Sequence, residues 1–232
     1  MAKLFISDLH LHKARPEVTH LFQEFIHSLP TLSVPDPELY ILGDLFEFWI
    51  GDDYEDPLHS EISDQLKNLV KSGIKTYLMH GNRDFFIGKE FLSKTSIELL
   101  PEPTIFSYKN KRVMLSHGDR FCIDDVEYQA YRKIVRNKDW QKKFLNYPIQ
   151  KRLEILNEAR DASMQSQQIK SNEIMDVNQN EVAKVIQKND IDILIHGHTH
   201  RPNIHTIDFD SKKSLRMVLG DWSQSTAKII EW

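Results

Sequence analysis

The sequence predicts an α/β (α+β) fold in which two β-sheets pack face to face and helices cover their outer sides. Residues 3–79 alternate short apolar runs, typical of strands, with 3.6-residue apolar periods, typical of helices, which indicates parallel βαβ units. From about Thr104 a hairpin pattern, a long helical stretch and more strand-like runs follow. We expect residues 1–232 to form one domain with a helical insertion at about 121–170.

The first half contains three expected strands, at 3–6, 39–42 and 74–79, each a short apolar run followed by polar residues or glycine. Pro16 opens a helix with a regular apolar face, and Gly73 ends the helix that precedes the third strand. Strand, helix and strand in this order predict parallel pairing.

The second half begins with an expected hairpin, whose strands at 104–108 and 112–116 flank Lys109-Asn110-Lys111. A helical stretch runs from about 124 to 188 and is expected to break near Pro148. Further strands are expected at 191–195, 204–209, 215–219 and 226–230.

Composition excludes several classes of protein. The chain has 40% apolar and 28% charged residues, so it is neither disordered nor fibrous, and its net charge of −4 argues against a nucleic-acid binder. Cys122, the one cysteine, forms no internal disulfide and is expected to be a packed small residue in a reducing compartment. We find neither a signal peptide nor a transmembrane segment, so a cytoplasmic protein is expected, with a monomer favoured.

Residues of the kind that bind metals follow five of the expected strands. They supply two carboxylates, one amide oxygen and four imidazoles, the ligand set of a two-metal site, and such sites hydrolyse phosphate esters. Imidazole with carboxylate suits Mn, Fe or Zn better than Mg or Ca. The segments are Asp8-Leu9-His10, Gly43-Asp44, Gly81-Asn82-Arg83-Asp84, His117-Gly118-Asp119 and Gly197-His198-Thr199-His200.

Each segment alone has an ordinary explanation. Asp-x-His arises often by accident, Gly-Asp after a strand is usually a turn, and Asp84 fits a helix N-cap. Two close histidines have no routine packing role, and in an extended segment Asp8 and His10 would point the same way. Five such segments in order favour one site. By contrast, we expect surface positions for His12, His20, His27, His59 and His205, orienting roles for His80 and His196, and no partner for Asp221.

The ordered set of five segments resembles the calcineurin-like metallophosphoesterase family, over residues 8–200. The resemblance implies a β-sandwich flanked by helices and a water, activated by two cations, as the nucleophile. Carried over by motif, one ion would be held by Asp8, His10, Asp44 and His200, and the second by Asp44, Asn82, His117 and His198.

One position departs from many members of that family. Arg83 stands where they have a histidine that is commonly treated as a proton donor. A guanidinium holds phosphoryl oxygens but does not release a proton near neutral pH, which suits a phosphate leaving group. We therefore expect pyrophosphate cleavage rather than hydrolysis of an alkyl phosphate.

Longer segments, among them residues 39–52, 80–85, 174–179 and 195–202, resemble the UDP-2,3-diacylglucosamine diphosphatases of bacterial lipid A biosynthesis. That resemblance implies two Mn²⁺ per chain and hydrolysis of the UDP-sugar lipid to UMP and 2,3-diacylglucosamine 1-phosphate, by a peripheral protein on the cytoplasmic face of the bacterial inner membrane. The implied substrate contacts are Asn82, Arg83, Asp125, Ser163, Gln167, Lys170 and His198.

The insertion has an unusual charge. Residues 132–152 contain eight basic residues and one acid, a local net charge of +7, with bulky apolar side chains between them. This pattern suits an anionic membrane surface or a cleft for acyl chains. It equally suits aromatic side chains that pack the insertion onto the sheets beneath a solvated basic face.

Three rival functions are a phosphoesterase for a soluble nucleotide or dinucleoside polyphosphate, a non-catalytic scaffold, and a nuclease. The basic, aromatic insertion argues against the first and the complete ligand set against the second. The third lacks the wide basic surface that nucleic acid requires.

Overall fold

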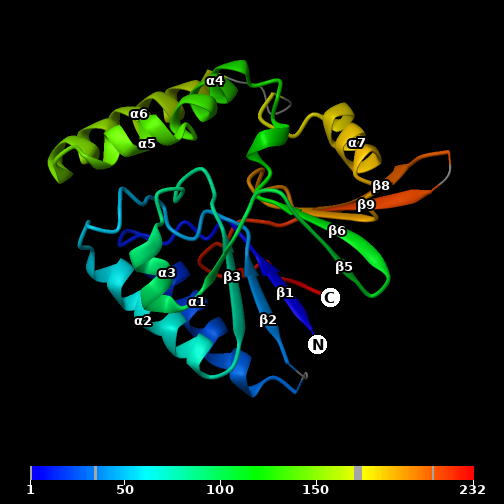
Figure 1. Cartoon of the computed structure of the whole chain (residues 1–232), viewed down its shortest axis with the longest axis horizontal. Helices are drawn as coiled ribbons and strands as arrows, with labels where there is room; N and C mark the ends of the chain where they lie inside the picture. The colour runs from blue at the N-terminus through cyan, green and yellow to red at the C-terminus, as the bar shows by residue number, and fades with distance from the viewer. Residues whose placement is uncertain (1, 34–35, 170–173, 211) are drawn as a thin grey trace.

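The computed structural model describes residues 2–33, 36–169, 174–210 and 212–232, and it contains two five-stranded sheets that face each other (Figure 1). In the first sheet the order is β10-β1-β2-β3-β4, with β1 to β4 parallel and β10 antiparallel to β1. These strands are β1 (Lys3–Ile6), β2 (Glu38–Ile41), β3 (Lys75–Met79), β4 (Glu98–Leu100) and β10 (Ile230–Glu231).

The second sheet has the order β5-β6-β7-β9-β8. The predicted hairpin is present as the antiparallel pair β5–β6, whereas β6, β7 and β9 pair in parallel and β8 is antiparallel to β9. Both sheets therefore send parallel strands toward one edge of the sandwich. The strands are β5 (Thr104–Tyr108), β6 (Lys111–Ser116), β7 (Ile193–His196), β8 (Asn203–Asp208) and β9 (Lys213–Val218).

Helices close the outer faces and apolar side chains fill the middle. Figure 1 shows α1 (Pro16–Ser28), α2 (Pro57–Lys71) and α3 (Lys89–Thr95) beside the first sheet and α7 (Gln179–Lys188) beside the second. The predicted β-sandwich flanked by helices is confirmed. Two short 3₁₀ helices, η1 and η2, span Leu29–Thr31 and Asp119–Phe121. The core between the sheets comprises Phe5, Tyr40, Leu42, Met79, Val113, Leu115, Ile193, Ile195 and Leu219.

Three further helices, α4 (Val126–Val135), α5 (Lys138–Leu145) and α6 (Ile149–Ile169), form an arm that lies over the loops at that edge (Figure 1). Buried Arg152 anchors the arm, because it donates to the carbonyl oxygen of Ile50 over 2.7 Å and pairs with Asp53. None of the helices in the described part of the chain is both long and apolar enough to cross a membrane.

Two expectations about elements were wrong. The stretch 124–188 breaks at more places than Pro148, because Asn137 leaves the helix with an extended backbone and caps α5 through its side chain. Of the strand expected at 226–230 only the last residue is in β10, since pairing with β1 is limited to the registers Leu4↔Glu231 and Phe5↔Ile230. The strand propensity of residues 226–229 was therefore overridden, because no strand in the described residues pairs with them in a sheet.

Candidate metal centre

The loops that follow five strands converge at the edge beneath the arm. Asp8 follows β1, Asp44 follows β2 and Asn82 follows β3 in the first sheet, while His117 and His198 follow β6 and β7 in the second. Because the carboxyl ends of parallel strands meet at one edge, residues distant in the sequence come together there. All seven proposed ligands lie in this one place.

One group of ligand atoms belongs to Asp8, His10 and His200, which lie within 4.8 Å of one another. The Nε2 atoms of His10 and His200 are 3.2 Å apart, and His200 Nε2 lies 3.5 Å from Asp8 Oδ1. Asp44 is the fourth ligand expected for this ion, and its Oδ2 lies 3.8 Å from His10 Nε2. The spacing suits donors that share one cation.

The second group contains Asp44, Asn82, His117 and His198. Asn82 Oδ1 lies 2.9 Å from His117 Nε2 and 2.8 Å from His198 Nδ1, and His117 Nε2 lies 3.7 Å from Asp44 Oδ2. Asp44 therefore faces both groups, as a bridging ligand must. Asp8 also lies within 4.8 Å of Asp44 and His117, so the two groups adjoin.

The donor set fits divalent cations. Asp8 Oδ1 is buried and accepts no hydrogen bond from the described residues, although Oδ2 accepts from Ser7 Oγ and from the backbone N–H of His198. A buried carboxylate oxygen without a hydrogen bond is costly unless a cation or a proton satisfies it. His117 Nδ1 faces the carbonyl oxygen of Leu42 at 2.9 Å, which leaves its Nε2 directed at the other ligands.

Electrostatics within the centre favour positive charge. Burial opposes charge on His117, yet Asp44 and Asp8 raise its pKa to about 9. Burial also opposes the charged form of Asp8, but His200, His117 and His10 hold the pKa of this carboxyl well below its usual range. In contrast, burial and the charge of His117 lower the pKa of His198 to about 3, so its imidazole is neutral and able to bind a metal.

The backbone at five of the seven proposed ligands is in the left-handed region. φ is +55° at Asp8, +51° at His10, +53° at Asp44, +70° at His198 and +55° at His200. Each costs about 1–3 kcal/mol in a residue with a side chain, and such strain is typical of functional sites. The expectation that Asp8 and His10 share one side of an extended segment was therefore wrong. They meet because the chain turns at both residues.

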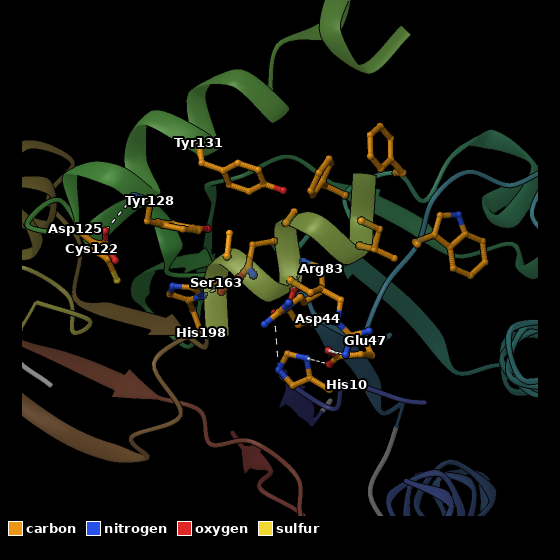
Figure 2. Close-up of a pocket in the computed structure, with 18 of the residues that line it drawn as sticks. His10, Asp44, Glu47, Arg83, Cys122, Asp125, Tyr128, Tyr131, Ser163 and His198 are labelled. Atoms are coloured by element: carbon orange, nitrogen blue, oxygen red, sulfur yellow. Dashed lines mark hydrogen bonds and ion pairs between the residues drawn. The ribbon is translucent and has the colours of Figure 1, made fainter. Parts of the chain in front are cut away.

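A cavity of about 700 Å³ joins the centre to the arm (Figure 2). Five of the proposed substrate contacts line it: the proposed ligands Asn82 and His198, and also Arg83, Asp125 and Ser163. The side chain of Gln167 and all of Lys170 lie outside the described residues. The rest of the wall is largely apolar and includes Trp49, Ile50, Phe85, Phe86, Trp140, Phe144, Ile155 and Leu156.

The family model for calcineurin-like phosphoesterases matches residues 1–202. The chain belongs to the calcineurin-like phosphoesterase family. It is also similar to proteins named UDP-2,3-diacylglucosamine hydrolase, with 44% identity to one from Haemophilus influenzae (strain PittGG) over 98% of this chain and 93% of the relative. Identity is 44% to one from Proteus mirabilis and 41% to one from Cellvibrio japonicus, each over 96% of this chain and 91% of the relative. The resemblance inferred from the motifs is confirmed.

In this calcineurin-like phosphoesterase the arm contacts the centre through Asp119, the last residue of the fourth segment. Fully buried Asp119 accepts hydrogen bonds from Tyr128 Oη over 2.9 Å and Arg132 Nε over 2.8 Å. The Tyr128 ring in turn stacks on His198, with ring centroids 5.7 Å apart. Asp119 therefore positions α4 over a proposed ligand instead of acting as one.

Several neighbouring residues differ from expectation. Asp84 is no N-cap, because it accepts from the backbone N–H groups of Gly81 and Leu45 and so joins two ligand loops, while α3 begins later with Gly88 as its cap. His59, expected at the surface, is buried among aromatic rings and stacks on Trp49, with centroids 4.5 Å apart. The aromatic residues that enclose it lie at positions 46–54, a loop whose path the sequence does not reveal.

Three other residues singled out in the sequence, His80, His196 and Cys122, lie beside the proposed ligand loops or the cavity. His80 Nε2 lies 2.8 Å from the carbonyl oxygen of Ile87, and His196 Nδ1 lies 2.9 Å from that of Gly197, so each contacts backbone beside a ligand loop. Cys122 is buried, and burial raises the pKa of its thiol to about 12, which fits the expected packing role.

Sequence reasoning missed two carboxylates beside the ligands. Glu47 Oε2 lies 3.2 Å from His10 Nδ1, and Asp221 Oδ2 lies 3.9 Å from His200 Nδ1. Burial opposes charge on Glu47, but His10 and Arg83 lower its pKa to about 2. The one signal in the sequence that Glu47 lies near the centre was its position just after Gly43-Asp44. Nothing in the sequence linked Asp221 to His200.

Proposed function

We propose that the chain hydrolyses the pyrophosphate bond of UDP-2,3-diacylglucosamine, giving UMP and 2,3-diacylglucosamine 1-phosphate, with two Mn²⁺ held by the seven ligands. The observation that carries the proposal is one cavity whose lining combines five of the seven proposed ligands and Arg83 with a wall of apolar side chains. One reaction centre and one lipid-compatible surface are thus available to the same substrate. The names of the relatives, which are hydrolases of this lipid, agree with it.

When bound, two cations would polarise the phosphoryl oxygens and lower the pKa of an attacking water. The protein's own part is orientation and charge. Arg83 donates from its backbone N–H to Asp44 Oδ1 over 2.8 Å, so its backbone is fixed to a ligand while its side chain lines the cavity. A guanidinium in that place would hold phosphoryl oxygens and stabilise the charge of a phosphate leaving group without releasing a proton.

The apolar wall supports a substrate with acyl chains over a soluble nucleotide. Phe86 stacks on Phe144 with ring centroids 4.5 Å apart, and Phe144 stacks on Trp140 at 5.3 Å. The Phe85 ring packs against Phe86 in a tilted arrangement, also with centroids 4.5 Å apart. These rings come from both the body and the arm, so the two together form an apolar surface that a nucleotide does not need.

We also propose that the arm rests on an anionic membrane surface. Val126 is 73% exposed and Ile134 54% exposed; eight residues apart on α4, they share one face. The exposed lysines Lys133 and Lys138 lie close to them in the sequence. Apolar side chains flanked by lysines favour binding to a negatively charged bilayer.

The direct test is release of UMP from UDP-2,3-diacylglucosamine with added Mn²⁺ and again after chelation. We expect release that depends on Mn²⁺, and slow turnover of UDP-glucose and a dinucleoside tetraphosphate. Absence of UMP with Mn²⁺ present would exclude the substrate assignment. Faster cleavage of the soluble compounds would favour the nucleotide phosphoesterase, and no turnover of any phosphoester would favour the scaffold.

A further inference from the structure

Glu47 joins the helical arm to a proposed metal ligand. Figure 2 shows it between His10 and the arm: Oε2 lies 3.2 Å from His10 Nδ1, and Oε1 lies 2.9 Å from an Nη2 atom of Arg160 in α6. The side chains of His10 and Glu47 are 9% and 17% exposed, so their contact is largely buried, whereas Arg160 at 31% is partly open to water. One carboxylate therefore connects a ring that faces the centre with a guanidinium in the insertion.

The two ring nitrogens of His10 have different surroundings. Nε2 faces the centre, 3.2 Å from His200 Nε2 and 3.8 Å from Asp44 Oδ2, so Nδ1 is the nitrogen that faces Glu47. Nδ1 is buried, and its contact with Glu47 is an ion-pair distance that is not aligned as a hydrogen bond. A carboxylate this close favours the tautomer with the proton on Nδ1, in which Nε2 carries a lone pair, and it restricts the plane of the ring. The geometry therefore gives Glu47 control over how well His10 binds a cation.

We propose that Glu47 is a positioning residue through which Arg160 and helix α6 influence the affinity of the centre for its cation. The inference rests on the proposed metal centre. Arg160 holds one carboxylate oxygen of Glu47 and so restricts the rotation of the other toward His10. Because coupling between two sites is reciprocal, cation binding also holds Arg160, and with it this part of α6, against the body.

The affinity of the protein for Mn²⁺ tests the proposal independently of catalytic activity. Free Mn²⁺ is counted by electron paramagnetic resonance during titration of wild type, Glu47→Gln, Arg160→Gln and the double variant. We expect Glu47→Gln to weaken binding about 10- to 100-fold, the usual effect of losing a partner of a metal-bound histidine. Arg160→Gln should weaken it less, and the double variant no more than Glu47→Gln alone, because Arg160 acts through Glu47.

Lys151→Gln is the matched control. Lys151 lies on the same helix and pairs with Glu154 over 3.1 Å, but at the surface, so its loss should leave Mn²⁺ affinity unchanged. Thermal unfolding of each variant verifies that it is folded, and Arg160→Gln, on the surface of the arm, keeps the test open if Glu47→Gln unfolds. Hydrogen exchange adds a second readout: amides at 156–163 should exchange more slowly with Mn²⁺ in wild type but not in Glu47→Gln.

Two results would overturn the inference while leaving the metal centre intact: Mn²⁺ affinity of Glu47→Gln within twofold of wild type, or additive losses in the double variant. Failure of the wild-type protein to bind Mn²⁺ would overturn both the centre and the coupling.

Discussion

Arg136, the C-cap residue that follows α4, donates from Nη2 to the carbonyl oxygen of Gly81 over 2.8 Å, and its guanidinium lies 5.2 Å from the centre of the Phe85 ring. The loop between these two contacts carries Asn82 and Arg83. A side chain of the insertion therefore stabilises the backbone that presents a proposed ligand and the proposed phosphate-binding arginine.

Replacing Arg136 with Met should lower stability by about 1–2 kcal/mol and reduce kcat/KM for the lipid substrate, because the Gly81 carbonyl loses its donor. Thermal unfolding and steady-state kinetics measure the two effects. Arg112→Met is the control: Arg112 donates from Nε to the Asn189 carbonyl over 2.8 Å on the second sheet, so its loss should leave kcat/KM unchanged. Equal kinetic losses in both variants would contradict the role of Arg136.

Arg83→His should reduce kcat for UMP release about 100-fold, as expected when a donor to a developing phosphoryl charge is lost. Mn²⁺ affinity should stay near that of wild type, because the contact with Asp44 is made by the backbone N–H of residue 83. Kinetics and Mn²⁺ titration on the same preparation separate the two effects. Unchanged turnover in Arg83→His would refute the assignment of this residue to the leaving phosphate.

Gly81→Ala should abolish tight Mn²⁺ binding. A Cβ at position 81 would lie 2.0 Å from Asp44 Oδ1 and 2.3 Å from Asp44 N, so the bridging carboxylate must move. Gly73→Ala provides the comparison, because a Cβ there meets nothing within 4 Å although φ is +98°. It should cost about 1–2 kcal/mol of stability through backbone strain and leave Mn²⁺ binding unchanged. Isothermal titration and chemical unfolding test the pair, and tight binding by Gly81→Ala would argue against the proposed ligands.

The free energy of unfolding should decrease at acid pH because Glu38 becomes protonated. Buried Lys3 pairs with Glu38, and Tyr40 Oη donates to Glu38 Oε2 over 2.9 Å; although burial opposes charge, these contacts lower the pKa of Glu38 below 4.5. A carboxyl whose folded pKa is depressed stabilises the fold above its unfolded value and loses that contribution as pH falls through the folded value. Glu38→Gln should therefore cost about 3 kcal/mol at pH 7 and progressively less below pH 4.5. Urea unfolding across this range measures the difference from wild type, which would be constant if Glu38 were unimportant.

Changing both Val126 and Ile134 to Ser should weaken sedimentation with anionic vesicles about tenfold, because two exposed apolar side chains of α4 are lost. Ile204→Ser removes an equally exposed apolar side chain, 62% accessible, from β8 on the second sheet and should have no effect. Equal losses in the two proteins would show that α4 is not the contact surface.

The sequence predicted the parts of this molecule that repeat simple periods. The β1, β2 and β3 runs and the hairpin were predictable because apolar side chains must be buried, and the ligand loops were predictable because they follow those strands. The seven proposed ligands were selected in this way, and the structure brings them together at one edge of the sandwich. Asp84 joins two loops, but the sequence does not distinguish this role from that of a helix cap, because both roles need the same short carboxylate.

Features that depend on tertiary contacts could not be predicted from the sequence. The left-handed backbone at Asp8 and His10 follows from how the loops fit together; Asp and His tolerate it better than most residues, but this preference is too weak to predict it from the sequence. His59 is buried because the 46–54 loop encloses it, and the sequence does not predict the path of that loop. The role of Glu47 depends on its contact with Arg160, which lies on a helix far away in the sequence. Such contacts join residues far apart in the chain.

One titration tests most directly the claim that the five segments form a two-cation hydrolytic centre. Bound Mn²⁺ per chain and the rate of UMP release from UDP-2,3-diacylglucosamine are measured together as Mn²⁺ is added to chelator-treated protein. We expect two bound ions per chain, with release that rises as the second binds and is lost in Asp44→Asn, which removes the proposed bridging carboxylate. Full release in the presence of chelator, or undiminished release by Asp44→Asn, would contradict it.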